Sequence, residues 1–124
     1  THVNSEMLQF YWSLGKDIVT LKAESRWGEK ILKYVSADLQ VKLPGIKGLS
    51  ETSIGYAKRF YTLYNKHFTI HPQAVGELQE SAIWRIPWGH HRYIIDKFFN
   101  APEKAMFFVK KTLENGWSKH AMLL

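Results

Sequence analysis

The apolar residues near the start of the chain recur at steps of four and three, which is the spacing of one face of an α-helix. They are Met7, Tyr11, Leu14, Ile18 and Leu21. The spacing predicts a first helix, with Asn4 or Ser5 as its N-cap. The same steps also fit a seam against a partner helix, but they cover only about two heptads, so packing within the domain is favoured.

A pair of helices joined by a glycine-containing turn is predicted next. Apolar spacing over residues 31–39 gives the first helix of the pair, and Pro44–Gly45 ends it. The second helix follows Ser50, a residue type that commonly caps helices. Its inward side is expected to consist of Ile54, Ala57, Tyr61 and Tyr64.

The rest of the chain is also predicted to be largely helical. Residues 67–86 give the weakest pattern, which allows a short extended segment at 67–70 and a short helix around 75–79. The remaining predicted helices are 89–99, 102–115 with Asn100 as its cap and Gly116 as its stop, and one that begins at Ser118. No alternating apolar and polar run is convincing as a strand, so the predicted fold is all-α, a compact domain of about six helices.

Three tryptophans each precede a residue that is expected to cap a helix. The pairs are Trp27–Gly28, Trp88–Gly89 and Trp117–Ser118. An apolar residue follows four positions after each cap, which is the spacing of a hydrophobic staple. A structural role is therefore favoured for these tryptophans over a role in stacking on bases.

Length and composition indicate one globular domain over residues 1–124. The hydrophobic fraction of 45% supplies enough material for a core, and no apolar run approaches the ~20 residues that cross a bilayer. Cysteine is absent, which excludes disulfides and thiol catalysis and fits a cytoplasmic location. Because the sequence begins at Thr1 and stops at Leu124 within an apolar run, we expect it to be a piece of a longer protein.

Basic residues concentrate in one segment of the chain. There are 17 Lys and Arg against 11 Asp and Glu, a net charge of +6. Residues 39–76 hold five of the basic residues and a single acid, and thus four of the six net charges. Such a concentration is typical of a protein that binds a polyanion, although a solvated basic surface without a partner has the same composition.

The helix pair around the Pro44–Gly48 turn has the outline of a helix-turn-helix unit. In such units the second helix enters the major groove of DNA, and phosphate contacts supply much of the affinity. An ordinary helical hairpin in a bundle is the alternative. The predicted nucleic-acid-binding residues are Lys42, Lys47, Thr52, Ser53, Tyr56, Lys58 and Arg59.

The sequence contains no phosphate-binding loop, dinucleotide fingerprint or nucleophile elbow. Adjacent His90 and His91 point about 100° apart on a helix, so they do not share a metal ion, and His91 is expected at the edge of the core with a hydrogen bond. His67 and His71 have the four-residue spacing of a helical metal site, but Pro72 argues against a ligand face. We therefore expect no catalysis, no metal and no cofactor in this chain.

Several stretches of the sequence resemble the N-terminal domain of the YhcG-type bacterial proteins. They are Leu8–Ile18, Trp27–Lys30, Ser36–Gln40, Pro44–Ser50, Arg59–Tyr61, Ile86–His91 and Thr112–Ser118. The C-terminal half of those proteins looks like a PD-(D/E)XK nuclease. The resemblance implies that this chain is a helical module of helix-turn-helix type placed before a metal-dependent nuclease domain.

The catalytic motif of such a nuclease is not present in these 124 residues. No Glu-x-Lys triplet occurs, and the nearest variant, Gln40-Val41-Lys42, ends a predicted helix. Divalent metal is therefore expected only in the nuclease domain that lies outside this chain.

Two functions remain open. The first is binding of nucleic acid, with DNA the expected form. The second is a protein-interaction module that assembles the nuclease, with a homodimer formed through the Met7–Leu21 helix. No membrane partner is expected.

Overall fold

The computed structural model describes residues 2–71 and 82–116, with side chains from residue 4 onward. Its helices, in chain order, are α1 (His2–Thr20), α2 (Ala23–Trp27), α3 (Ile31–Lys42), α4 (Glu51–Ile70), α6 (Trp88–Phe98) and α7 (Pro102–Asn115). Residues 82–84 form a further helical turn, and no strand occurs within these ranges. The all-α prediction is therefore confirmed. No helix in the described part of the chain is long and apolar enough to cross a membrane.

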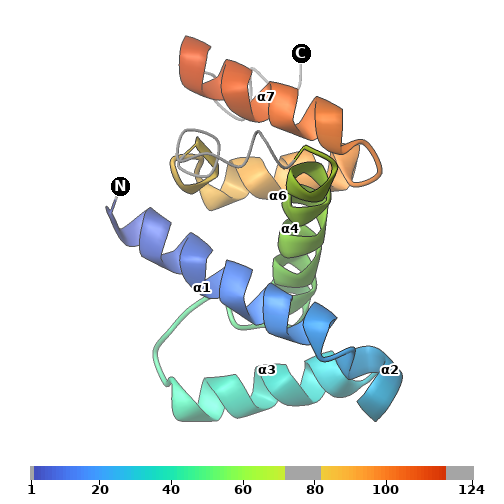
Figure 1. Ribbon diagram of the computed structural model, residues 1–124. Coiled ribbons are helices and arrows are strands. Elements are labelled where there is room, and N and C mark those ends of the chain that lie inside the picture. The colour runs from blue at the N-terminus through green and yellow to red at the C-terminus, as the bar shows by residue number, and fades with distance from the viewer. Residues whose placement is uncertain (1, 72–81, 117–124) are drawn as a thin grey trace.

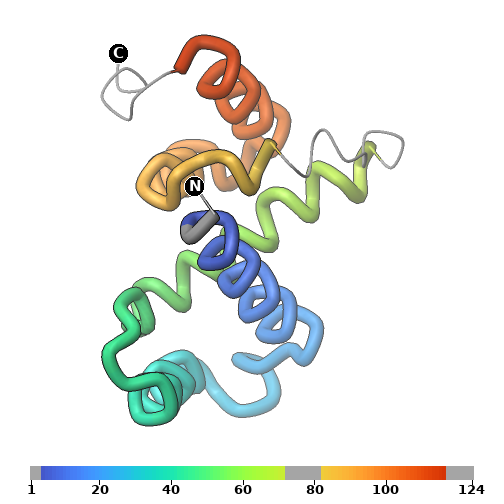
Figure 2. Tube along the Cα trace, turned by 90° about the vertical axis from the view of Figure 1, so that its left-hand side faces the viewer, coloured from blue at the N-terminus to red at the C-terminus, as the bar shows by residue number. Residues whose placement is uncertain are grey.

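Helix α4 is the element around which the others are arranged. It packs against α1, α3, α6 and α7. In Figure 1, α2 and α3 lie at the bottom, α6 and α7 at the top, and α1 crosses between them. Figure 2 shows the same order from the side, with α4 running diagonally from the α3 end toward α7.

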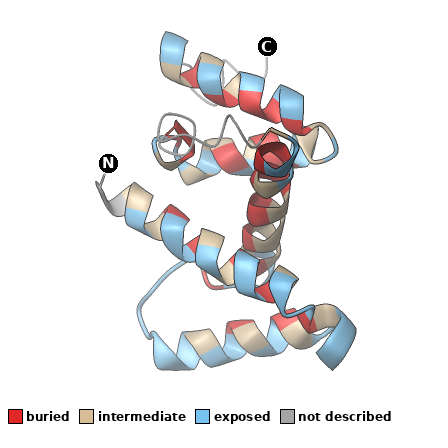
Figure 3. Cartoon of the chain, in the orientation of Figure 1, coloured by how far each residue is buried: buried red, intermediate tan, exposed pale blue. Residues whose placement is uncertain are grey.

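The buried side chains form two clusters that α4 joins. The larger lies between α1, α4, α6 and α7 and includes Leu8, Phe60, Ile94 and Val109. The smaller lies between α1, α2, α3 and α4 and consists of Ile18, Ala23, Leu32 and Ile54. Figure 3 shows that buried residues follow the inward face of each helix. The predicted inward stripe of α4, namely Ile54, Ala57, Tyr61 and Tyr64, is buried throughout and is confirmed.

Side chains from α1 and α3 hold the turn between α3 and α4. The Tyr11 hydroxyl donates to the carbonyl of Gly48 over 2.7 Å, and the Ser36 hydroxyl donates to the carbonyl of Leu49 over 2.6 Å. Gly48 has a φ of 82°, a conformation that favours glycine. Ser50 then caps α4 as predicted, because its side chain accepts from the Ser53 amide. These contacts fix the direction in which α4 leaves the turn.

Several predicted helix ends are wrong. Helix α1 begins at His2, so Asn4 and Ser5 lie inside it, and Ala101 rather than Asn100 precedes α7. Residues 67–70 are helical, not extended, because His67 and Phe68 are buried against the core, and this tertiary packing prolongs α4. The helices predicted around 75–79 and from Ser118 lie outside the described residues, whereas the stop at Gly116 is confirmed.

The predicted tryptophan staples are also wrong where the structure describes them. Gly28 is the C-cap of α2, a short helix that the sequence analysis missed, and Trp27 is its last residue. Trp88 is the first residue of α6 and is stacked on Tyr11, with ring centroids 4.5 Å apart. Trp88 thus packs against the core by stacking on α1 and not by a staple within its own helix. Trp117 lies outside the described residues.

The closest approach in the fold is between α1 and α4. Gly15 is buried at this point, and a Cβ added to it would overlap the carbonyl oxygen of Ala57 and lie 3.0 Å from the Cβ of Tyr61. Because the obstacle is largely main chain, it cannot move aside by a change of rotamer. The two helices can therefore cross at this depth only with glycine at residue 15.

Substitution of Gly15→Ala should lower the free energy of unfolding by about 2 kcal/mol, since the added methyl group forces the helices apart. Gly55→Ala is the matched control, because a Cβ at Gly55 in α4 meets nothing within 4 Å. That change should raise the stability by about 0.5–1 kcal/mol through the better helix propensity of alanine. Urea unfolding followed by circular dichroism measures both. Equal effects of the two substitutions would contradict the close crossing.

Candidate nucleic-acid interface

Two of the predicted contact lysines are paired with acidic residues. Lys42 lies 2.9 Å from the carboxylate of Asp38, one turn earlier in α3. Lys58 is paired with Glu24 of α2 through a hydrogen-bonded contact. Asp38 is one helical turn from Lys42 in the sequence, whereas Glu24 lies outside the basic segment and approaches Lys58 only through the packing of α2.

The other predicted residues on the turn side are dispersed. Lys47 is exposed and borders a hollow with Phe10 of α1. Thr52 is exposed in the first turn of α4, whereas Ser53 takes part in the cap through its amide and its hydroxyl. Helices α3 and α4 run crosswise in Figures 1 and 2, but residues 43–50 separate them, a longer connection than the turn of a typical helix-turn-helix unit.

Tyr56 and Arg59 are the two predicted residues that the structure brings together, and α6 completes their surroundings. The guanidinium carbon of Arg59 lies 4.5 Å from the centre of the Tyr56 ring, and that of Arg92 lies 4.4 Å from it. The Tyr56 hydroxyl donates to the carboxylate of Asp96, with oxygen distances of 2.7 and 2.9 Å. We call Tyr56, Arg59, Arg92 and Asp96 the arginine–tyrosine cluster.

A polar hollow opens beside this cluster. Gly89 and Tyr93 of α6 line it together with Tyr56, Arg92 and Asp96. Lys97 follows on the same helix and donates to the Tyr93 hydroxyl over 3.1 Å. Two guanidinium groups thus lie over one tyrosine ring, and a second tyrosine and a carboxylate line the hollow beside them. Guanidinium groups bind phosphate through paired hydrogen bonds, so the chemistry suits the phosphate backbone of a nucleic acid.

Sequence reasoning missed the contribution of α6 to this surface. Arg92 and Asp96 lie outside the basic segment of residues 39–76, and nothing in their spacing links them to α4. The two helices meet because Ile94 and Ile95 of α6 are buried in the larger core cluster. The charged residues of α6 are brought to Tyr56 by that burial.

A buried polar bridge fixes α6 against α4. The His91 ring is fully buried, with Nδ1 2.9 Å from the Tyr64 hydroxyl and Nε2 2.8 Å from the carbonyl of Ile83. Because a carbonyl only accepts, Nε2 carries the proton and Nδ1 accepts from Tyr64. Burial lowers the pKa of His91 to about 4 and raises that of Tyr64, so both side chains are neutral. The predicted hydrogen bonding of His91 is confirmed, but its ring lies fully inside the core and not at the predicted edge.

This bridge should make the domain sensitive to acid. His91 has an ordinary pKa of 6.5 in the unfolded chain and about 4 in the folded one, so the unfolded state binds more protons between these values. The free energy of unfolding should therefore have its highest value above pH 6.5 and fall by up to about 3 kcal/mol as the pH approaches 4. Thermal unfolding at pH 7.5, 6, 5 and 4.5 measures this decline.

His91→Gln should flatten this decline relative to the unmodified chain, because the titrating group is gone. His90→Gln, one residue away on the same helix, is the matched control and should retain the decline. An unchanged slope in the His91 variant would contradict the assignment.

Comparison with known proteins gives one match. The family model described as DUF1016 N-terminal domain matches residues 1–123. No curated protein and no solved structure matches the chain.

Proposed function

The chain belongs to the DUF1016 N-terminal domain family, and from this premise we propose that it is a non-catalytic module that binds nucleic acid, with DNA the expected form. The observation that carries the proposal is the arginine–tyrosine cluster between α4 and α6. The proposal assigns binding alone to this chain, and assigns metal-dependent cleavage to a nuclease domain outside it. A cytoplasmic location is part of the same proposal.

The geometry of the cluster supports binding of a phosphate next to a base. Tyr56 is held by Asp96, so its ring is fixed before a ligand arrives. Arg92 is exposed and Arg59 half-buried, and each guanidinium presents several donors in a planar fork. A phosphate can accept from these donors while a base or sugar lies over the polar hollow beside them. Preorganised groups of this kind reduce the ordering cost of binding.

The paired lysines are secondary contacts in this proposal. The side chains of Lys42 and Asp38 are 69% and 60% exposed, and exposed ion pairs contribute only about 0–1 kcal/mol. A phosphate can therefore displace Asp38 from Lys42. The Lys58–Glu24 pair, with side chains 37% and 33% exposed, is screened less by solvent and is harder to displace. Lys47, in the turn before α4, adds a positive charge. Thr52, in the first turn of α4, adds a hydroxyl group.

The double variant Arg59→Gln/Arg92→Gln should weaken binding to a duplex DNA probe at least tenfold in fluorescence polarisation at low salt. Affinity of the unmodified chain should fall steeply as salt rises, because phosphate contacts release counterions. The matched control is Lys33→Gln/Lys110→Gln, which removes the same charge from exposed positions of α3 and α7. It should change affinity by less than threefold if the cluster, and not net charge, binds the probe.

Failure of the unmodified chain to bind both duplex and single-stranded probes at low salt would end the proposal. Equal losses in the two double variants would leave a non-specific charge effect and would also reject the cluster as the binding site.

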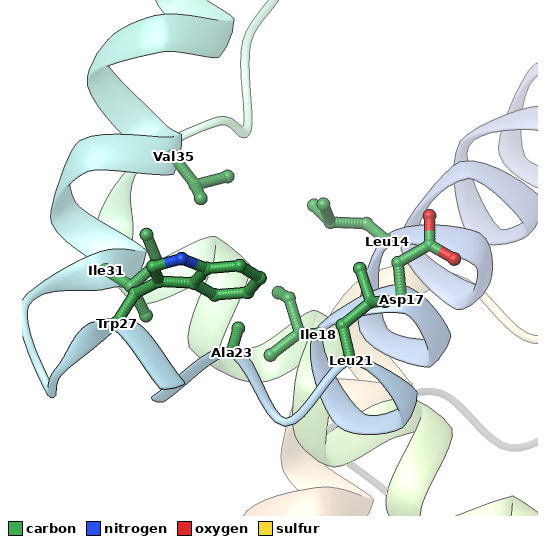
Figure 4. A pocket seen from close by; sticks show the side chains of 8 residues that line it. All are labelled: Leu14, Asp17, Ile18, Leu21, Ala23, Trp27, Ile31 and Val35. Atoms are coloured by element: carbon green, nitrogen blue, oxygen red, sulfur yellow. The ribbon is translucent and has the colours of Figure 1, made fainter. Parts of the chain in front are cut away.

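A second candidate function is self-association, and a specific apolar hollow favours it. The apolar face of α1 that was predicted as a possible dimer seam packs mostly within the domain, since Tyr11 and Ile18 are buried. An apolar hollow of about 330 Å³ lies between α1, α2 and α3, next to the smaller core cluster. Figure 4 shows side chains of α1 facing those of α2 and α3 across it. Its lining residues are Leu14, Asp17, Ile18, Leu21, Ala23, Trp27, Ile31 and Val35.

Leu21→Glu should abolish any dimer of the chain, because it places a charge in a surface that a second copy must desolvate. Light scattering over a concentration series measures the association. Val41→Glu is the matched control, since Val41 is 79% exposed and does not line the hollow. Dimers that persist in the Leu21 variant, or a chain that is monomeric at all concentrations, would exclude this candidate.

A further inference from the structure

The last turn of α4 places two histidines side by side. His67 and His71 are four residues apart, and their ring centroids lie 4.9 Å from each other. His71 is the C-cap, and its amide still donates to the carbonyl of His67 over 3.0 Å, so the two residues keep helical register. From the sequence, Pro72 argued against a shared ligand face, but only the residue directly before a proline has to leave the helix, and α4 continues to Ile70.

A carboxylate from α7 completes a group of three ligands. Glu103 lies in the first turn of α7, and its Oε1 is 2.6 Å from Nε2 of His71 and 3.6 Å from Nδ1 of His67. One donor atom from each residue lies within 4.8 Å of the other two. Glu103 directly follows Pro102, which is buried at the start of the helix.

We propose that His67, His71 and Glu103 form a binding site for a divalent transition-metal ion of the zinc class. Two imidazoles and one carboxylate are a common ligand set for zinc, and histidines four residues apart present both rings on one side of a helix. Donors around a tetrahedral zinc ion are about 3.3 Å apart. The two distances to Glu103, 2.6 and 3.6 Å, lie on either side of this value, and the two imidazole donors, which are within 4.8 Å of each other, would have to rotate toward the ion to bind it.

The exposure of the three residues suits uptake of an ion from solution. His67 is buried and fixes one ligand, whereas His71 and Glu103 have side chains 34% and 60% exposed and can adjust to the metal. Three protein ligands leave the fourth position of zinc to water. The ion would link the C-terminal end of α4 to the N-terminal end of α7. The site shares no residue with the arginine–tyrosine cluster, so the metal titration tests it separately from nucleic-acid binding.

The alternative is a plain ion pair between His71 and Glu103, and titration with metal separates the two. The chain, produced without a polyhistidine tag, is titrated with Zn²⁺ by calorimetry at pH 7.5, with Mg²⁺ as the comparison ion. We expect one Zn²⁺ per chain and a melting temperature several degrees higher in its presence. Mg²⁺, which prefers oxygen ligands, should give neither effect.

His71→Ala and Glu103→Ala should each weaken Zn²⁺ binding at least tenfold, whereas the matched control His90→Ala on α6 should leave it unchanged. Nuclear magnetic resonance of the unmodified chain supplies a test that needs no variant: Zn²⁺ should shift the imidazole nitrogens of His67 and His71 and not those of His90. The absence of stoichiometric binding, or equal binding by all three variants, would overturn the proposal. So would imidazole shifts confined to histidines outside the group.

Discussion

The contact between the main chains of α1 and α4 at Gly15 and Ala57 is the constraint on which the rest of the structure depends. It sets how deeply the two helices approach, and the larger core cluster forms around that crossing. Leu8, Tyr11 and Trp12 of α1 then meet Phe60 of α4 and Trp88 of α6 within one aromatic core. A wider crossing would separate these rings and leave α6 without its packing surface.

From this crossing, α4 positions different chemistry at its two ends. Its first half carries Tyr56 and Arg59 beside α6, and its last turn carries His67 and His71 beside α7. The His91–Tyr64 bridge lies between these groups and holds α6 in one orientation, because a buried neutral imidazole must keep both of its hydrogen bonds. The packing of the core thus fixes the positions of the polar groups that α4 and α6 carry at the surface.

The basic segment shows why the net charge of a stretch of sequence does not predict the charge of one surface of the protein. Adjacent residues of a helix point in different directions, so Lys58 meets Glu24 of α2 while Arg59 lies over Tyr56 near α6. Lys42 is paired within its own helix. Two of the basic residues of the segment are thus paired with acids, and one of the two guanidinium groups of the arginine–tyrosine cluster belongs to Arg92, which the segment does not contain.

The sequence by itself determined the helical class, the inward stripe of α4, its Ser50 cap and the Gly116 stop, because periodicity and capping act within a few residues of one helix. It failed at the start of α1, at short α2 and at the last turn of α4. In that last turn, the burial of His67 and Phe68 outweighs local preference. Only the tertiary structure decided which polar side chains from different helices meet. Tyr56 and Asp96, or His71 and Glu103, lie more than 30 positions apart in the chain, and their contacts arise from the packing of apolar residues elsewhere on the same helices.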